Sequence, residues 1–262
     1  RRSTDLSLLG HARTYVCLDF LRGVWEHQHE QLIASRAGGT NNNCPPPPLF
    51  VMNITDVDDK ILAATASFAT VTSFDDGDPI AWARKYDAAF WKDLDALNCL
   101  RPHVVTRVTE HVSSHIIPMI DRLVQHGMAY SIVNSSGSDD GDMAGVYFDV
   151  QAFERQQGSW TRYGKLAPSS QATTTTMTAR EEGDTNGGAD LNTSNKKRDP
   201  RDFALWKASK PRERTLSWEA PWGRGRPGWH IECSAMIEAV RERFGQTHEF
   251  VLHTGGVDLK FP

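Results

Sequence analysis

Residues 49–60 read Leu-Phe-Val-Met-Asn-Ile-Thr-Asp-Val-Asp-Asp-Lys, an apolar run of strand length that ends in a cluster of carboxylates. The run over 49–54 predicts a buried β-strand with a polar exit. In open α/β sheets, ligands bind at the carboxyl ends of such strands. A solvated acidic loop and a calcium loop are the alternative interpretations of 56–59, although the stretch lacks the glycine and terminal glutamate of an EF-hand.

Helical patterns lie on both sides of this strand. Apolar residues recur near helical spacing over 10–32, a proline near the start favours a helix over 79–97, and Gly127 ends a helix that begins near Arg107. Toward the other end of the chain, the sequence predicts a strand over 202–207, a helix over 229–244 and a strand over 249–253. This alternation favours an α/β fold.

Two segments break the pattern. Residues 35–48 hold three consecutive Asn and four consecutive Pro, which favours an exposed linker. Strands predicted over 128–133 and 146–150 form a small β-rich insertion, and the polar segment 171–195 after them is predicted to be disordered, because it has too few large apolar residues to form a core.

Composition narrows the classes of function. The 262 residues carry 29 Lys+Arg against 33 Asp+Glu, a formal charge of -4, so any contact with nucleic acid must use a local patch. Four cysteines without a CxxC pair favour a reducing compartment, cytoplasm or an organelle matrix. No apolar stretch approaches the roughly 18 residues that cross a bilayer, and we expect no membrane partner. The sequence opens on Arg1 and ends just after a Gly-rich motif, so we expect a piece of a longer protein.

Three groups of residues could carry chemistry. Gly10 and His11, expected at a helix start, could face a phosphate, although they are as compatible with an ordinary helix end. His230 and Cys233 lie three apart on a predicted helix and could both approach a metal, or be a capping histidine and a buried thiol. The segment 253–258 offers close backbone approach and a carboxylate suited to ribose, or ordinary turn chemistry.

Taken together, five segments resemble the catalytic domain of cysteinyl-tRNA synthetases, which are class I aminoacyl-tRNA synthetases. They are Gly-His-Ala-Arg at 10–13, Asn-Ile-Thr-Asp-Val-Asp-Asp-Lys-Ile at 53–61, Asp-Phe-Ala-Leu-Trp-Lys at 202–207, Gly-Arg-Pro-Gly-Trp-His-Ile-Glu-Cys-Ser-Ala-Met at 225–236, and His-Thr-Gly-Gly-Val-Asp-Leu-Lys-Phe-Pro at 253–262. The resemblance covers nearly the whole chain outside its two low-complexity inserts, which are similar to those of eukaryotic forms.

The resemblance implies ATP-dependent activation of L-cysteine to cysteinyl-adenylate, with magnesium, and transfer of the cysteine to tRNA(Cys). It also implies one zinc ion in the complete enzyme, which selects the thiol because serine's hydroxyl is a poor ligand. The matching positions are Gly10 and His11 for catalysis at the ATP phosphates, Thr55, Trp229, His230 and His253 for substrate, Gly255, Gly256 and Asp258 for ATP, and Cys233 for the metal.

Departures from the family pattern carry expectations of their own. Leu8 stands where the His-x-Gly-His signature has its first histidine, so one donor to the phosphates is lost. The family's other zinc ligands match positions outside 1–262, as does the Lys-Met-Ser-Lys-Ser loop. We therefore expect weak zinc binding by the chain as given.

The predicted fold is a class I synthetase Rossmann-like domain with a connective-polypeptide insertion. Its halves are placed at 1–127 and 203–262, with the insertion at 128–202. Two rival functions remain: a related ligase that passes cysteine to an amino-sugar, and a catalytically dead binding module derived from a synthetase.

Overall fold

The computed structural model describes residues 4–36, 45–68, 78–133, 144–157, 163, 197–209, 216–245 and 248–255. The segment predicted to be disordered, 171–195, lies outside these residues, as do 37–44 of the predicted linker. The elements in chain order are α1 (Thr4–Arg36), β1 (Val51–Ile54), α2 (Asp59–Phe68), α3 (Pro79–Ala96), β2 (Val104–Arg107), α4 (Val108–His111), the π-helical turn η1 (Val112–Ile116), α5 (Ile117–Gln125), β3 (Ala129–Ile132), β4 (Gly145–Phe148), α6 (Val150–Gln157), β5 (Phe203–Ala208), β6 (Gly225–Pro227) and α7 (Trp229–Phe244).

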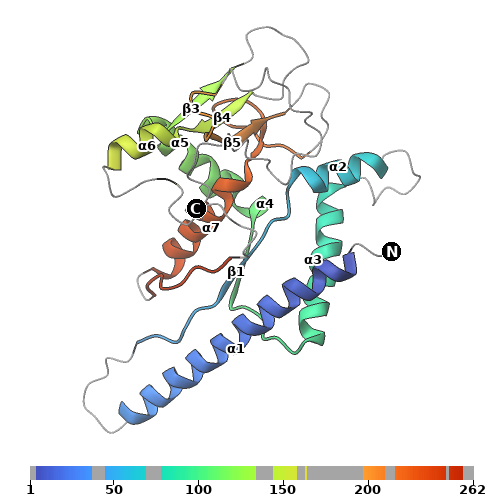
Figure 1. The fold of residues 1–262 in the computed structure, drawn as a ribbon, viewed down its shortest axis with the longest axis vertical. Coiled ribbons are helices and arrows are strands. Elements are labelled where there is room, and N and C mark those ends of the chain that lie inside the picture. Colours follow the sequence, from blue (N-terminus) through green and yellow to red (C-terminus); the bar gives the residue numbers. More distant parts are fainter. Residues whose placement is uncertain are drawn as a thin grey trace, which may run out of the picture.

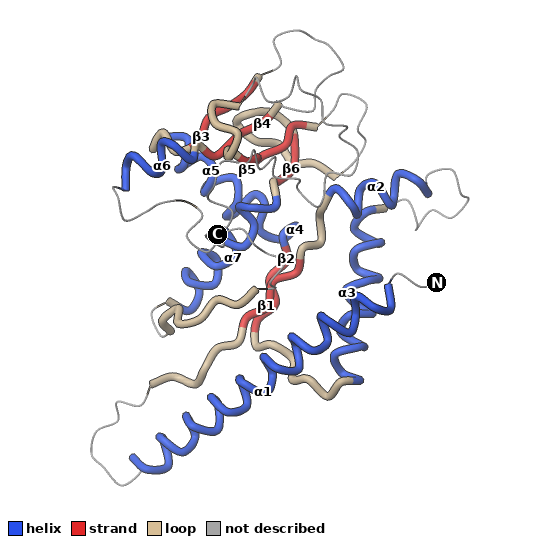
Figure 2. Tube along the Cα trace, in the orientation of Figure 1, coloured by secondary structure: helices blue, strands red, loops and turns tan. Residues whose placement is uncertain are grey.

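A parallel pair of strands lies at the centre of the molecule (Figure 2). The predicted strand at 49–54 is β1, which pairs in parallel with β2, Asn53 opposite Thr106. Helices α2 and α3 form the crossover between them. The predicted helix over 79–97 is confirmed as α3, where the Asp78 carboxylate accepts the Ile80 N–H at 3.0 Å and Pro79 occupies the first turn.

The core is built on the helical stretch after β2. Four residues spaced by four, Val108, Val112, Ile116 and Ile120, have no exposed surface and form one face through α4, η1 and α5. The predicted helix over 107–127 is therefore confirmed as a helical stretch, with a π-helical turn at its middle. Ile231 and Met236 of α7 belong to the same cluster, and this packing fixes α7 against α4, η1 and β5.

The second sheet is antiparallel, in the order β3-β4-β5-β6 (Figures 1 and 2). It combines strands from the predicted insertion with strands predicted to lie in the second half of the catalytic domain. Trp206 of β5 is fully buried and joins this sheet to the core. The three-part division of the chain stays a prediction, and this sheet crosses the boundary placed at 202.

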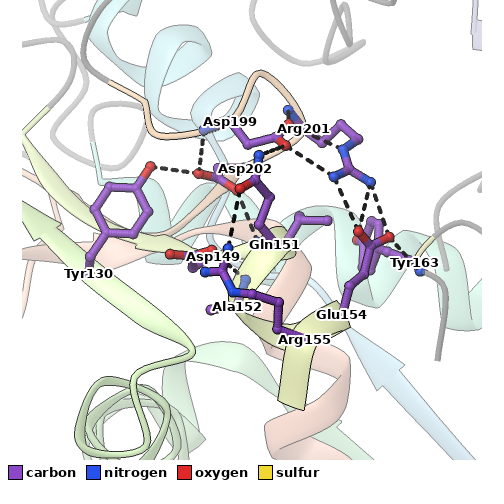
Figure 3. A network of polar contacts seen from close by, with 11 residues as sticks. Tyr130, Asp149, Gln151, Ala152, Glu154, Arg155, Tyr163, Asp199, Arg201 and Asp202 are labelled. Atoms are coloured by element: carbon purple, nitrogen blue, oxygen red, sulfur yellow. Dashed lines mark hydrogen bonds and ion pairs between the residues drawn. The ribbon is translucent and has the colours of Figure 1, made fainter. Parts of the chain in front are cut away.

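A buried polar network holds α6 and the start of β5 together (Figure 3). The Asp202 carboxylate accepts the Tyr130 hydroxyl at 2.8 Å and the N–H groups of Val150 and Asp199, each at 3.0 Å. Arg201 donates to both Asp199 and Glu154. Tyr163 donates its N–H to Glu154, so these bonds connect residues 154 and 163 with residues 198–202.

Two predicted boundaries are wrong. Helix α1 begins at Thr4 and not at Gly10, because the Leu-Ser-Leu-Leu stretch before Gly10 contains no helix breaker. Residues 249–253 are not a strand; they are exposed and run without a ladder partner among the described residues. Helices α2 and α6 and strands β2 and β6 were not predicted. The carboxylates at 56–59 obscured the start of α2.

Helix α1 crosses α3 at the edge of the molecule (Figure 1). The ring of Tyr15 packs edge-on against Phe90 with centroids 5.2 Å apart. Arg22 donates to the Arg101 carbonyl at 2.7 Å and to Glu26 at 2.6 Å. In the part of the chain that is described, no helix is long and apolar enough to cross a membrane.

Candidate functional site

Two motif segments meet where β1 ends. Asn53 of β1 donates through Nδ2 to Cys233 Sγ at 3.3 Å, a contact between residues 180 positions apart. Thr55, just past β1, hydrogen-bonds Glu232 in the first turn of α7. The core packing of α7 thus places its first turn at the carboxyl end of a parallel strand, which is the position where α/β sheets bind ligands.

Glu232 is the unexpected member of this site. Its side chain is 2% exposed, and its Oε2 has no hydrogen-bond partner among the described residues. Burial, followed by the charges of Asp58 and Asp56, raises the pKa of the Glu232 carboxyl well above its ordinary value. The sequence contained a signal for this residue. Glu232 lies on the face of the predicted helix that the helical period assigns to the core, where a carboxylate is unusual.

Trp229 and His230 open α7. Trp229 is half-exposed at 51%, while the His230 ring packs edge-on against Phe203 with centroids 4.8 Å apart. Burial, then the nearby charges of Lys207 and Lys197, lowers the pKa of His230 to about 4. His230 is therefore a neutral imidazole near pH 7.

Cys233 faces β1 and His230 faces β5, so the two side chains contact different neighbours. Burial, then the Glu232 charge, raises the pKa of the Cys233 thiol, which favours the protonated form. Within the described residues, no three His, Cys, Asp or Glu side chains lie close enough together to hold a metal ion. Joint ligation of a metal by His230 and Cys233 is thus unsupported, and the described residues do not form a zinc site.

Asp59 joins the site to the antiparallel sheet. Its carboxylate accepts from Lys207 Nζ of β5 at 2.7 Å and from Arg226 of β6, Nε at 3.0 Å and Nη2 at 2.7 Å. Burial acts to raise the pKa of Asp59, but the combined effect of the two cations is larger and the pKa is lowered. Arg226 lies three residues before Trp229, so this cluster ties the start of α2 to the strand that leads into α7.

The acidic stretch is thus structural rather than a calcium loop. Asp56 Oδ1 accepts the Thr109 N–H at 2.9 Å, and its Oδ2 accepts the Thr109 hydroxyl. These two hydrogen bonds, together with the two cations on Asp59, hold the turn after β1 in place between α4 and the antiparallel sheet. Thr55 lies inside that turn.

The other predicted site residues lie elsewhere in the described part of the chain or outside it. Gly10 and His11 lie inside α1, so their N–H groups are not the free donors of a helix start, and their side chains are not described. His253 and Gly255 are exposed, with the His253 ring against Phe250 at 6.2 Å. Gly256 and Asp258 lie outside the described residues.

The fold and this meeting of motifs define the catalytic domain of a class I tRNA synthetase, and the family comparison agrees. The model described as "tRNA synthetases class I (C) catalytic domain" matches residues 46–262. The chain belongs to that family.

Relatives over nearly the whole chain give the same result. The chain is 36% identical to the chloroplastic/mitochondrial cysteine–tRNA ligase of Arabidopsis thaliana, over 98% of this chain and 35% of the relative. It is 41% identical to the cysteine–tRNA ligase of Anaeromyxobacter sp. (strain K) and 38% identical to that of Pyrococcus horikoshii, each over 98% of this chain and 42% of the relative. The chain thus spans well under half the length of these relatives.

Proposed function

We propose that this chain forms the cysteine-activating part of a cysteine–tRNA ligase, which joins L-cysteine to ATP as cysteinyl-adenylate and then to tRNA(Cys). The observation that carries the proposal is the contact of Asn53 with Cys233, by which two motifs of the family meet at the carboxyl end of β1. Its relatives include forms named cytoplasmic and chloroplastic/mitochondrial, and we propose the cytoplasm or an organelle matrix for this chain too.

The chemistry is in-line attack of the cysteine carboxylate on the α-phosphate of ATP, with pyrophosphate leaving. Such a step needs positioning and charge stabilisation rather than a protein nucleophile. Thr55 and Trp229 would hold the amino acid at the end of β1. The neutral ring of His230 and the protonated thiol of Cys233 would add no net charge there, which suits a small zwitterionic substrate.

The residues proposed to bind ATP are assigned from the family resemblance. Gly10 and His11 would approach the phosphates, with His253 near the substrate, and Gly255, Gly256 and Asp258 would hold the adenosine with magnesium on the phosphates. Zinc, if present in the whole enzyme, would take Cys233 as one ligand. The described donors do not complete its coordination, and we derive no step through it.

One observation favours a second candidate, an inactive synthetase-derived module. In α1, Gly10 is the seventh helical residue, beyond the first four N–H groups that a helix leaves free for an anion. Leu8 removes a donor from the same signature. An amino-sugar ligase has no such observation in its favour.

Cysteine-dependent ATP–pyrophosphate exchange separates these candidates. The proposal expects exchange with cysteine that exceeds exchange with serine, and Trp229→Ala should lower kcat/KM for cysteine at least tenfold if the indole contacts the substrate. Trp25→Ala on α1 is the matched control and should have no effect. Exchange that is absent in the wild-type chain, while the chain still binds ATP, would support the inactive module.

A further inference from the structure

Two histidines face each other at the π-helical turn that follows α4. His111 ends α4, and His115 lies four residues later in η1. Their Nδ1 atoms are 3.2 Å apart, and their ring centroids are 5.0 Å apart with the ring planes at 70°. Both residues are only partly buried, and single π-helical turns inside helices are frequent at functional sites. We call His111 and His115 the η1 histidine pair.

The spacing of the η1 histidine pair is close to that of two imidazoles bound to one metal ion. Bonds of about 2.0–2.1 Å to a tetrahedral ion hold two ligand nitrogens about 3.3–3.4 Å apart and their ring centroids about 5.2 Å apart. The observed distances of 3.2 Å and 5.0 Å are both slightly shorter. A head-on hydrogen bond between nitrogens 3.2 Å apart would instead place the centroids about 5.5 Å apart. The two Nδ1 atoms therefore face a common point, and a small opening of the pair would admit an ion there.

A carboxylate of α7 orients one of the two rings. Glu242 Oε2 lies 3.2 Å from His115 Nε2. When the Nε2–H donates to that carboxylate, the neutral ring presents the lone pair of Nδ1 to His111. The Ser114 hydroxyl, 2.8 Å from the same Nδ1, is a competing donor that can rotate away. Metal-binding histidines usually donate their second N–H to a carboxylate in this way, which fixes the tautomer and the orientation of the ring.

The charges around the η1 histidine pair favour a cation. Glu110 and Asp56 both lie close enough to act on the charge of the ring that ends α4, and Glu242 is a third carboxylate beside the pair. Arg107, which also lies near Glu110, is paired with Asp87 at 2.7 Å. A divalent ion between the two rings would therefore be attracted by nearby carboxylates.

We propose that His111 and His115 chelate an exchangeable divalent transition-metal ion through their Nδ1 atoms, with Glu242 holding the His115 ring. Nickel, copper and zinc are the ions that suit imidazole ligands, and two histidines four residues apart on a helix can bind one ion together. No third His, Cys, Asp or Glu of the described residues completes a cluster here, so water would fill the remaining positions.

Two protein ligands make this a weak site whose ion exchanges with solvent. It is separate from Cys233, which contacts Asn53 at the end of β1, and it does not depend on the proposed function. Because Glu242 belongs to α7, a bound ion would strengthen the contact between η1 and α7, which lies beside α4 in Figure 1.

Isothermal titration calorimetry with NiCl₂ near neutral pH tests the proposal on the untagged 262-residue chain. We expect one Ni²⁺ per chain. His111→Ala and His115→Ala each destroy the chelate and should weaken binding by at least about 100-fold, beyond the 10- to 100-fold that loss of an outer partner costs. His27→Ala removes an exposed histidine of α1 outside the pair and is the matched control, which should bind as the wild type does.

The role of the carboxylate has its own variant. Glu242→Gln should weaken Ni²⁺ binding roughly tenfold, at the low end of that range, because the Glu242 side chain is 65% exposed. Ni²⁺ should also raise the Tm of the wild type and of His27→Ala but not that of His115→Ala. A Glu242→Gln chain with wild-type affinity would overturn the role of the carboxylate.

A measurement on the wild type does not depend on how the variants fold. Paramagnetic Ni²⁺ should broaden the ring NMR signals of His111 and His115 before those of the other histidines. Absence of Ni²⁺ binding by the wild type, equal affinities of His115→Ala and His27→Ala, or first broadening at other histidines overturns the proposal.

Discussion

The first turn of α7 and the signature segment of α1 carry motifs of the same family, yet the two helices differ in how much of their surface is packed in the core. The α7 motif is part of the core: Ile231, Ala235 and Met236 are each at most 5% exposed. No side chain described for α1 belongs to the hydrophobic core, and Phe20 is 75% exposed.

This contrast shows when a motif fixes its own geometry. Around Trp229, the residues proposed for the site alternate with residues that pack in the core, so burial of the second group positions the first. The described side chains of α1 gain no such packing, and 253–255 are exposed at the surface. Motif residues without buried neighbours depend on other parts of a protein, or on a ligand, for their position.

The largest expected effect comes from the glycine that precedes α7. A Cβ on Gly228 would lie 2.0 Å from the Ala204 carbonyl oxygen, a backbone atom that cannot move aside cheaply. We expect Gly228→Ala to lower the free energy of unfolding by about 3 kcal/mol or more, as overpacking against backbone does. Urea denaturation followed by Trp fluorescence measures the loss.

Helix α1 provides the matched control. Gly23 has no atom within 4 Å of its would-be Cβ. Gly23→Ala should therefore stabilise the chain by roughly 0.5–1 kcal/mol, through the helix propensity of alanine. If both alanine variants changed stability equally, the distinction between the two regions would fail.

The next effect tests the ion-pair cluster that ties the start of α2 to the strand that leads into α7. Asp59→Ala removes the carboxylate that accepts from both Lys207 and Arg226, so we expect the free energy of unfolding to fall by about 1–2 kcal/mol. Asp95→Ala removes an ion pair with Arg101 that is exposed to solvent, and it should change stability less than Asp59→Ala does. A smaller loss for Asp59→Ala than for Asp95→Ala would contradict the assigned role of the cluster.

Most of the fold could be predicted from the sequence, because the spacing of apolar residues indicates which face of an element is buried. The helix over 229–244 has the predicted limits, and β1 and α3 lie within two residues of theirs. The π-helical turn could not be predicted, since its apolar spacing of four matches an ordinary helix. Nor could the ladder of β5 with β4, because pairing depends on residues far apart in the sequence.

The site could be predicted only in part. The motifs identified Thr55, Trp229 and Cys233, but a motif contains no information about which side chains meet, so the contact of Asn53 with Cys233 required the structure. Glu232 was missed because acidic residues are seldom buried. Asp59 had been interpreted with its acidic neighbours, and only the fold shows the two cations that it binds.

A smaller effect concerns pH and the polar network that holds α6 and the start of β5 together. Hydrogen bonds from Arg201, against the opposing effect of burial, lower the pKa of Asp199 to about 2. Because the ordinary aspartate pKa is about 3.9, Asp199 contributes stability above that pH, and the contribution disappears as the pH falls through about 2. Thermal unfolding from pH 6 to pH 2 should show a shallower loss in Asp199→Asn than in the wild type, whereas parallel curves would contradict the network's role.

The smallest expected effect is on metal content. A closed zinc site needs three or four ligands in tetrahedral geometry, and Cys233 stands in the described part of the chain without two further donors. Its thiol is half-buried, protonated and engaged with Asn53, which opposes the thiolate that zinc requires. The purified 262-residue chain should therefore hold far less than one equivalent of zinc after gel filtration, and Cys233→Ser should leave that content unchanged. Stoichiometric zinc that Cys233→Ser abolishes would show that residues outside the described part complete a site around this thiol, and α7 would then owe its position to a ligand as well as to the core.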